Sequence, residues 1–492
     1  TNRRNMLERG GKRLNLALVS SFFRWQSGVY EPVGSGGSYA QKGNTNRMNL
    51  LFISLGCDKN LVDTEKMLGI LGKEGYSFVD DENEADIVVV NTCCFIGDAK
   101  EESINTILQM AELKKNGRLK ALIVTGCLAQ RYKQEIIDEI PEVDAILGTT
   151  SYEAVGAAIR EVMDGETPEI FESIDAPVST ATERLITTGG HYAFLKIAEG
   201  CDKRCTYCII PYLRGKYRSV PMEQLVREAE ELAEKGVKEL ILVAQETTLY
   251  GKDLYGEKKL PELLRRLAAV SGIQWIRLQY CYPEEITDEL IETIKTEEKV
   301  CNYLDIPIQH ASDAVLKRMG RRTNNKEIRG LIAKLRKEIP DIALRTTLIS
   351  GFPGETEEDH EILMQFVDDM EFDRLGVFAY SPEEDTPAFS FENQVPEEVK
   401  QDRRDEIMEL QQEIAFEKSE AMKGRTLEVM IEGKVADENA YVGRTYMDSP
   451  NVDGLIFVNT GLSLMSGDFL KVRVTGASEY DLIGEAEDEF TE

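Results

Sequence analysis

The sequence predicts a multidomain α/β protein with a parallel-sheet α/β domain first, a partial (β/α)6 barrel next and a small antiparallel β-barrel at the C-terminal end. Three observations support this prediction. Between residues 48 and about 150, continuous apolar runs of strand length alternate with helical segments. The same alternation returns between 187 and 422 with six strand-like runs. After Gly424, short alternating segments follow one another between Gly, Asn and Asp residues.

Residues 1–47 differ in composition from the rest of the chain, and we expect them to be a disordered leader. They contain eight Lys and Arg against two acids, and the glycine-rich run GSGGS. The stretch LNLALVSSFF imitates a secretion signal but lacks a small-residue cleavage site. Met48 opens a clean apolar strand, so we expect the functional protein to start there.

Residues 48–165 are expected to form the first α/β domain. Its predicted strands are NLLFISLG, ADIVVVNTC and ALIVTGC, with KMLGILGKEG and AKEESINTILQMAELKK as helices. Cys57, Cys93 and Cys127 each follow one of these strands, and ligands of open α/β sheets gather beyond the carboxyl ends of strands. Three equivalent positions predict a shared iron–sulfur site, with buried structural cysteines as the alternative.

A polar linker is expected at 166–186, and the (β/α) segment at 187–422 follows it. The six expected strands are YAFLKIAE, ELILVAQ, WIRLQY, YLDIPIQ, IALRTTLIS and RLGVFAY. Catalytic residues of such barrels occupy the loops at the carboxyl ends of the strands. Directly after the first strand stand Cys201, Cys205 and Cys208, a CxxxCxxC triad.

This triad predicts a 4Fe–4S cluster with one open iron. Such clusters are normally held by four thiolates, so three ligands leave one iron free to bind a small molecule. A structural zinc site would need a fourth Cys or His, and none lies near the triad in the sequence. Core packing is expected for Cys94, Cys281 and Cys301, although Cys94 stands beside Cys93 and competes with it as a ligand.

Residues 423–490 are expected to form the β-barrel, and this module is acidic. From Arg425 to Glu492 it holds five Lys and Arg against fourteen Asp and Glu, and the whole chain has a formal net charge of −30. Such a field repels phosphate backbones and favours a basic protein partner, so direct nucleic acid binding is not expected. The alternative is that the acids only form a solvated face. No apolar run reaches the length of a membrane span.

Over residues 48–490 the chain resembles the radical S-adenosylmethionine (SAM) methylthiotransferase family. The motifs are SLGCDKNLVDTE, NTCCFIGDAKEESI, TGCLAQRY, AEGCDKRCTYCIIPYLRG, VAQETTLYGKDLYG, LDIPIQH and LRTTLISGFPGETEED. Members that modify tRNA usually show GCQMN in the first motif and GQNV in the fifth, which this chain lacks. It is more similar to the branch that modifies an aspartate of small-subunit ribosomal protein S twelve. Asp58, Cys94 and Glu246 depart from the usual residues without removing a ligand.

The resemblance implies two 4Fe–4S clusters and SAM as cofactors. Cys201, Cys205 and Cys208 would hold the cluster that cleaves SAM to a 5′-deoxyadenosyl radical, which takes a hydrogen from the β-carbon of the target aspartate. The first three cysteines would hold the cluster that delivers the methylthio group. The resemblance also implies that the C-terminal barrel is a TRAM domain and that the two clusters face one another across a cavity. It further implies an electron donor such as flavodoxin or ferredoxin and a cytoplasmic location.

The resemblance gives four SAM-binding candidates: Tyr207, Gln245, Glu246 and Gly351. No catalytic residue beyond the cluster ligands is assigned. Each of them has a turn residue as its alternative, as do the other members of the run Gly351 to Gly354. Lys196 and Arg214 are candidates for contacting SAM or substrate, with solvated surface charges as the alternative. Among the three histidines, His310 at a strand end is the most interesting.

Two other functions stay open at this point. A tRNA adenosine methylthiotransferase would share both cysteine sets. A non-enzymatic iron–sulfur carrier would hold clusters but form no 5′-deoxyadenosine from SAM.

Overall fold

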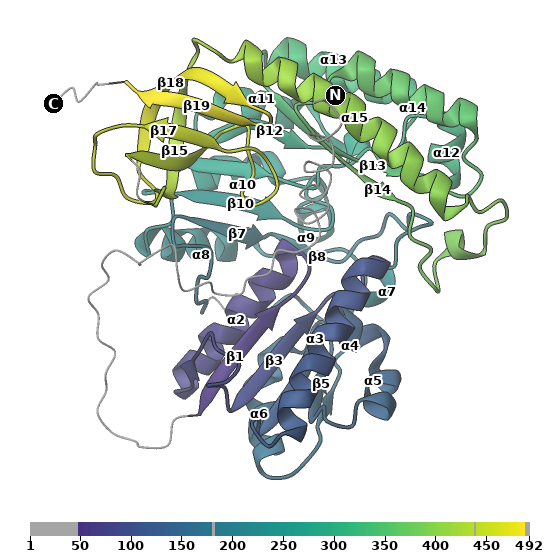
Figure 1. Cartoon of the computed structure of the whole chain (residues 1–492), viewed down its shortest axis with the longest axis vertical. Coiled ribbons are helices and arrows are strands. Elements are labelled where there is room, and N and C mark those ends of the chain that lie inside the picture. Colours follow the sequence, from purple (N-terminus) through teal and green to yellow (C-terminus); the bar gives the residue numbers. More distant parts are fainter. Residues whose placement is uncertain (1–47, 180–182, 437–438, 488–492) are drawn as a thin grey trace, which may run out of the picture. The chain divides into compact units, whose positions relative to one another are not determined.

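The computed structural model describes residues 48–179, 183–436 and 439–487 (Figure 1). The leader predicted at 1–47 lies outside these residues. The chain divides into two compact units. Unit 1 consists of the residues up to Thr187 together with the later segment Ile210–Lys216. Unit 2 consists of Thr188–Ile209 and the residues from Tyr217 onward.

Unit 1 is built on a six-stranded parallel sheet in the order β2-β1-β3-β4-β5-β6. Every residue of the two central strands β3 and β4 is buried, which explains their continuous apolar sequences. The predicted parallel-sheet domain is confirmed. The strands are β1 (Asn49–Ser54), β2 (Ser77–Phe78), β3 (Ile87–Thr92), β4 (Ala121–Gly126), β5 (Ala145–Leu147) and β6 (Glu169–Ile170).

Helices cover this sheet and complete its core. The helix α2 ends at Gly75, whose φ of 90° lets its N–H reach back to the carbonyls of Leu71 and Gly72. The described helices of the unit are α2 (Asp58–Glu74), α3 (Gly97–Lys115), α4 (Cys127–Arg131), α5 (Lys133–Glu139), η1 (Tyr152–Ala154), α6 (Val155–Met163) and α7 (Ile210–Arg214).

Unit 2 contains a second six-stranded parallel sheet, in the order β14-β13-β12-β11-β10-β7. The sheet is open, so the predicted partial (β/α)6 barrel is confirmed. The strands are β7 (Tyr192–Lys196), β10 (Glu239–Val243), β11 (Trp275–Leu278), β12 (Val300–Asp305), β13 (Ala343–Ser350) and β14 (Arg374–Ala379), and a separate hairpin joins β8 (Ala198–Glu199) to β9 (Arg218–Ser219).

Amphipathic helices alternate with these strands. Two of them begin with a capping box, at Asn324 for α13 and at Thr356 for α14. The helices and turns are α8 (Met222–Glu234), α9 (Lys252–Tyr255), α10 (Leu260–Ala268), η2 (Pro283–Glu285), α11 (Asp288–Thr296), α12 (Asp313–Arg318), α13 (Asn325–Glu338), α14 (Glu357–Met370), η3 (Pro387–Ser390) and α15 (Glu397–Ala421).

The C-terminal module of unit 2 is a closed barrel in the order β15-β16-β17-β19-β18. Its strand pairs are antiparallel except for β17 with β19, which is parallel. The predicted small β-barrel is therefore confirmed, while its last strand was not predicted. The strands are β15 (Thr426–Lys434), β16 (Ala440–Thr445), β17 (Ile456–Asn459), β18 (Phe469–Ser478) and β19 (Asp481–Ala486).

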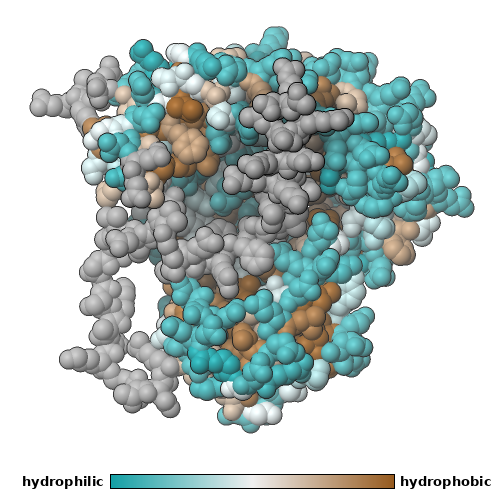
Figure 2. Space-filling view, viewed as in Figure 1, coloured by the Kyte–Doolittle hydropathy of each residue, from teal (hydrophilic) through white to brown (hydrophobic). Residues whose placement is uncertain are grey.

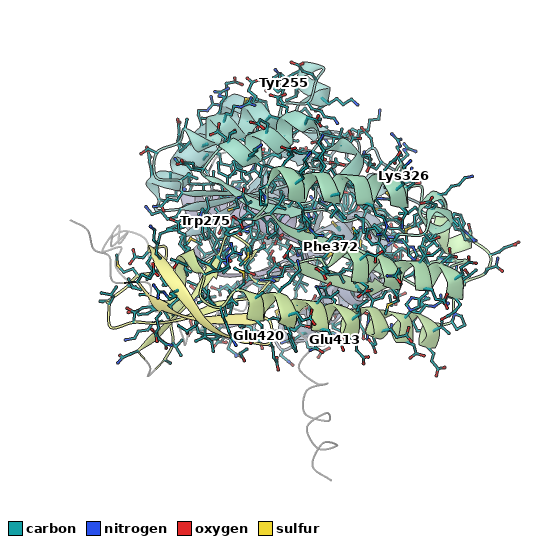
Figure 3. The ribbon with its side chains drawn as sticks, turned by 90° about the horizontal axis from the view of Figure 1, so that it is seen from above. Tyr255, Trp275, Lys326, Phe372, Glu413 and Glu420 are labelled. Carbon is teal, nitrogen blue, oxygen red and sulfur yellow. The ribbon has the colours of Figure 1, made fainter. Side chains whose placement is uncertain are left out.

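The long helix α15 leads from the open sheet to this barrel. Its buried residues recur at helical spacing, for example at Arg403, Ile407, Gln411 and Ile414. Figure 3 shows Glu413 and Glu420 on this helix, with Phe372 lying toward the interior of the unit. Hydrophilic side chains predominate over the outer surface of α14 and α15 in Figure 2.

Buried ion pairs join the barrel to the open sheet. Glu239, the first residue of β10, accepts from Arg277 Nε at 2.7 Å and from Arg444 Nη2 of β16 at 2.6 Å. Arg444 Nε also donates to Glu432 of β15 at 2.6 Å, and Glu432 pairs with His191 at 3.0 Å. The guanidiniums keep the pKa of Glu239 below its usual value although burial opposes them.

Apolar contacts accompany these ion pairs. Met430 of the barrel belongs to one core cluster with Trp275, Cys301 and Tyr303. Trp275 also meets Phe469 edge to face, with 4.8 Å between the ring centroids, and Figure 3 shows it beside the barrel. Since Glu239 and Trp275 are the first residues of their strands, the barrel covers the N-terminal ends of the strands.

Among the described residues, no helix combines the length and the apolar character that crossing a bilayer requires.

We expect Arg444→Met to destabilise unit 2 by about 3–5 kcal/mol, because it removes one partner of a buried ion-pair network and leaves Glu239 and Glu432 undercompensated. The measurement is denaturant unfolding followed by the fluorescence of Trp275, which packs on the barrel. The control is Arg473→Met in the same barrel, where the pair with Glu487 is exposed, and there the midpoint should barely move. Equal shifts in both variants would contradict the assignment.

Candidate functional site

The loops that follow β1, β3 and β4 carry the first cysteine set. Cys57 is the N-cap of α2, Cys93 follows the last residue of β3, and Cys127 is the first residue of α4. These strands are parallel neighbours, so the three loops leave the sheet at the same edge. Cys93 and Cys127 are buried, while Cys57 is exposed.

The three thiols lie within electrostatic reach of one another. Burial raises the pKa of Cys93 well above its usual value, and the Cys127 and Cys57 thiols raise it further. Gly56 lies even closer to Cys93: a Cβ on Gly56 would come within 2.8 Å of the Cys93 sulfur. Its φ of 90° also belongs to the region that favours glycine, so the loop depends on this residue.

Buried hydrogen bonds tie the cysteine loops together. The amide Nδ2 of Asn60 donates to the carbonyls of Leu55 at 3.1 Å and of Thr92 at 3.0 Å, which joins the loops after β1 and β3. Thr92 Oγ1 donates to the carbonyl of Thr125 at 2.6 Å, which joins β3 to β4. Ser103 accepts from the N–H of Cys93 at 3.0 Å. The thiol positions are therefore set by a rigid frame.

The second set follows the first strand of the open sheet. Cys201 comes after β8 and Gly200, whose φ is 81°, and the N–H of Cys208 donates to the carbonyl of Cys205 at 3.0 Å. Burial raises the pKa of Cys201 to about 12; the neighbouring Cys205 thiol adds to this effect, and a backbone hydrogen bond from Lys203 opposes it. A bound cation would favour the thiolate at such a site.

Tyr207 stands inside the triad and packs against Phe352, the residue that follows Gly351. Its pKa is raised by burial first and then by the thiols of Cys205 and Cys208. Its ring meets Phe352 edge to face, with 6.3 Å between the centroids. Two of the predicted SAM-binding positions therefore lie on adjoining loops.

Gly351 and Gly354 both have structural reasons to be glycine. Their φ values are 68° and 79°. A Cβ on Gly351 would lie 2.3 Å from the side chain of Lys400, and one on Gly354 would overlap Arg318. Packing accounts for these glycines without a ligand.

Gln245 and Glu246 follow β10 and present acceptor atoms. Gln245 donates to Glu199 at 2.7 Å, and its own Oε1 is buried without a hydrogen-bond partner. Glu246 accepts from the N–H of Thr248 at 2.9 Å through Oε1, while its buried Oε2 has no hydrogen-bond partner and lies 3.9 Å from Lys203 Nζ. Burial raises the pKa of Glu246 to about 7.

Sequence reasoning missed Lys203, Tyr282 and Arg321 beside the second triad. Tyr282 places its hydroxyl 3.8 Å from Cys205 Sγ, and Arg321 stacks 4.3 Å over its ring. Lys203, inside the triad, donates to Glu284 at 3.1 Å and to Glu285. Tyr282 follows β11, so the rule on carboxyl ends of strands could have found it.

A cavity of about 310 Å³ in unit 2 opens beside Lys203. Most of its lining residues are charged, although the surface that they present to the cavity is more apolar than polar. The lining residues are Asp202, Lys203, Tyr217, Leu249, Lys252, Asp253, Glu285 and Arg322.

Lys196 and Arg214 are buried, so their interpretation as solvated charges is wrong. Lys196 donates to Glu199 at 2.8 Å within unit 2. Arg214 donates to Asp63 at 2.9 Å within unit 1. His310 is also buried: its Nδ1 accepts from the N–H of Ser312 at 3.0 Å.

Both cysteine sets fit an iron–sulfur cluster. Their donors are soft thiolates in largely buried loops, and positive-φ glycines let the backbone close around them. Within the described ranges, no three His, Cys, Asp or Glu side chains are close enough to hold one metal ion. Cluster ligands bind separate irons, so they surround a cluster and need not meet at one point.

The remaining three cysteines are also buried. Cys281 has no exposed surface, and Cys301 belongs to the core cluster with Trp275 and Tyr303. Cys94 is also fully buried.

Three known families match consecutive parts of the chain. Residues 49–148 match the Uncharacterized protein family UPF0004, 195–367 match the Radical SAM superfamily, and 424–486 match the TRAM domain. A ribosomal protein uS12 methylthiotransferase RimO from Lachnoclostridium phytofermentans is 67% identical over 440 residues, which are 89% of this chain and 100% of that protein.

The chain belongs to the RimO family of radical SAM methylthiotransferases. RimO proteins from Acetivibrio thermocellus and Clostridioides difficile are 53% and 51% identical, each over 88% of this chain and 97% of the relative. As a RimO family member the chain is a transferase whose cofactors are 4Fe–4S clusters and SAM.

A solved structure shares the RimO fold at low identity. It is the radical SAM methyltransferase TsrM from Kitasatospora setae, with a TM-score of 0.51 and 13% identity, and it covers 70% of this chain and 77% of TsrM. At this identity the likeness concerns the fold alone.

We expect Gly56→Ala to lower the iron content of the reconstituted protein from about eight to about four irons, because the new Cβ would displace Cys93 and spare the second triad. The matched control is Gly75→Ala, which has the same φ of 90° but open space around it. Both glycines have a φ of 90°, so the close contact with Cys93 is the main difference between the two variants. Iron and sulfide analysis after anaerobic reconstitution measures the effect, and full iron content in Gly56→Ala would contradict it.

Proposed function

We propose that this chain attaches a methylthio group to the β-carbon of an aspartate of uS12, the small-subunit ribosomal protein S twelve. The observation that carries the methylthio transfer is the pair of three-cysteine sets, each in loops at the carboxyl ends of a parallel sheet; it does not distinguish a protein from a tRNA substrate. The relatives named as uS12 methylthiotransferases, with up to 67% identity, support the same substrate.

Each cysteine set would hold one 4Fe–4S cluster. Cys57, Cys93 and Cys127 would be the ligands in unit 1, and Cys201, Cys205 and Cys208 those in unit 2. Cys93 is preferred to Cys94 because its thiol interacts with both Cys57 and Cys127. When bound, the clusters and SAM supply electron transfer, a hydrogen-abstracting radical and the methylated sulfur.

The residues around the second triad would bind and orient SAM. The free Oε2 of Glu246 and Oε1 of Gln245 are buried acceptors suited to the ammonium of SAM, and that cation would favour ionised Glu246. Tyr207 would flank the adenine, and Gly351 would lie near SAM through its loop beside Phe352, although packing against Lys400 already explains why this residue is glycine. Glu246 is fully buried, while Gln245 and Tyr207 are partly buried, and together they limit the access of water to a radical reaction.

The acidic barrel would attract the basic substrate. Three of its acids already form ion pairs within unit 2. Glu432 pairs with Arg444, Asp448 pairs with Arg374, and Asp453 lies 3.3 Å from Arg345. Exposed acids remain at Glu428, Glu479 and Glu485. They are free to steer a Lys-rich and Arg-rich protein by complementary charge.

The location of the barrel limits what it can do for the substrate. It covers the N-terminal ends of β10 and β11, whereas Gln245 and Glu246 follow the carboxyl end of β10. A substrate held only on the barrel is therefore at the opposite end of the strands from the SAM-binding candidates. We infer that the barrel contributes to capture and that other loops present the target aspartate.

Two further parts of the proposal concern the surroundings of the enzyme. An electron donor such as flavodoxin or ferredoxin would reduce the cluster in unit 2, since SAM cleavage consumes an electron. A cytoplasmic location follows from a ribosomal protein substrate.

We expect reduced wild-type protein to form 5′-deoxyadenosine from SAM and to add the mass of one methylthio group to uS12. Cys205→Ala should abolish both, because it removes a ligand of the SAM-binding cluster. Cys57→Ala should retain 5′-deoxyadenosine formation and about four of eight irons, but lose methylthio transfer. Anaerobic assays with mass spectrometry of uS12 and of tRNA measure these outcomes.

Each alternative gives a different result in these assays. Modification of tRNA with unaltered uS12 would replace the proposal by a tRNA methylthiotransferase. Intact clusters without 5′-deoxyadenosine would indicate an iron–sulfur carrier.

We expect the combined change of Glu428, Glu479 and Glu485 to Gln to raise the KM for uS12 severalfold at low salt and to weaken its dependence on ionic strength. The control changes three equally exposed acids on α14, Glu358, Glu361 and Asp368, to the corresponding amides, so net charge is matched. An equal effect of both sets would show that net charge, rather than the barrel surface, attracts the substrate.

A further inference from the structure

A buried arginine of unit 1 reaches the sulfur of one proposed cluster ligand. Arg214 Nη2 lies 3.5 Å from Cys127 Sγ, and its Nη1 donates to Asp63 Oδ2 at 2.9 Å. Nη2 also contacts the side-chain oxygen of Asn60. The Arg214 residue is only 2% exposed, so these interactions occur away from solvent.

The backbone fixes this side chain in place. Arg214 is the last residue of α7, and the carbonyl of the preceding Leu213 accepts from Thr149 Oγ1 at 2.8 Å. The next residue, Gly215, has a φ of 71°, and a Cβ there would come within 2.5 Å of Asp175. The N–H of Lys216 donates to the same carboxylate at 2.8 Å. The chain therefore binds unit 1 on both sides of Arg214.

The same contacts join Arg214 to the frame that positions the cysteines. Asn60, which Arg214 contacts, links the loop after β1 to the loop after β3. Asp63 lies on α2, the helix that Cys57 caps. One guanidinium thus contacts the Cys127 thiol, the helix that Cys57 caps, and Asn60, the residue that ties the Cys93 loop.

The chemistry of a guanidinium suits this position. A cation that donates a hydrogen bond stabilises a thiolate, and the effect is stronger in a buried site than in water. Hydrogen bonds to cluster sulfurs and nearby charge are among the factors that set the reduction potential of an iron–sulfur cluster. The reduced cluster is more negative, so a nearby cation favours it and raises the potential.

A purely structural ion pair between Arg214 and Asp63 is the simpler explanation. Buried ion pairs of that kind add little net stability, because the desolvation of both groups offsets their attraction. An ion pair also gives no reason for the second nitrogen to be directed at Asn60 and Cys127. The contact with the sulfur is what separates the two explanations.

We propose that Arg214 is a positioning residue for the cluster of unit 1, which it holds in place through Cys127 and whose reduction potential it raises. This inference rests on the proposed function, since it requires Cys57, Cys93 and Cys127 to hold that cluster. It also assigns a role to sequence order: α7 begins two residues after Cys208, so the loop that ends the SAM-binding triad continues into the segment that supports the other cluster.

The test uses full-length protein in which Cys201, Cys205 and Cys208 are changed to Ala, so that only the cluster of unit 1 remains. After anaerobic reconstitution, iron is counted and the potential is measured by a redox titration followed by electron paramagnetic resonance. In this background we expect Arg214→Gln to shift the potential to a more negative value. Arg214→Lys keeps the positive charge but loses the planar guanidinium with its paired N–H donors, so it should shift the potential less.

The matched control is Arg184→Gln. Arg184 is an equally buried arginine of unit 1, and it pairs with Glu65 at 2.6 Å. The control should lower the stability of unit 1 and leave the potential of the cluster unchanged. A shift in Arg184→Gln as large as in Arg214→Gln would overturn the inference, because it would reflect general loosening of the unit.

The outcomes also separate this inference from the proposed function. If the background protein with Arg214 intact binds no iron, the ligand assignment fails. If Arg214→Gln keeps about four irons with the parent potential, only the role of Arg214 fails. If Arg214→Gln loses the cluster, Arg214→Lys and Arg184→Gln decide: about four irons in both of these variants support the inference, and loss of the cluster in Arg184→Gln as well overturns it.

Discussion

Parallel pairing of neighbouring strands is the constraint on which both proposed sites depend. Parallel strands end at the same edge of a sheet, so folding brings together there residues that are far apart in the sequence. In unit 1 this rule gathers Cys57, Cys93 and Cys127, whose strands are direct neighbours. In unit 2 it gathers the cysteine triad with Gln245 and Tyr282, which follow β10 and β11.

The same directionality gives the two ends of the open sheet different chemistry. Beyond the carboxyl ends, buried acceptors such as Glu246 Oε2 lack hydrogen-bond partners, which costs free energy unless a ligand satisfies them. At the N-terminal ends the charges of Glu239, Arg277 and Arg444 satisfy one another, and the C-terminal barrel closes over them. A cofactor would satisfy the acceptors at the first end, whereas the charges at the other end are satisfied by the protein itself.

Segment α7 shows how a short stretch of chain can serve a distant site. It follows the second cysteine triad in the sequence but is anchored in unit 1 by Thr149, Asp175 and Asp63. Its arginine brings a positive charge to the Cys127 thiol, beside a second thiol, Cys93, whose pKa is raised by burial. A metal cluster and a guanidinium would both lower the cost of thiolates at that place.

Sequence patterns alone determined the order and type of the domains, because apolar runs such as those of β3 and β4 report burial on both faces directly. They missed β2, β5, β6 and β9, which are only two or three residues long, and β19, whose apolar residues are interrupted by Gly and acids. The cysteine spacing of the second triad was readable because it is local. Only the tertiary structure decided that Arg214 and Lys196 are buried and paired. A charged residue in a sequence does not show which oppositely charged residue will lie beside it after folding.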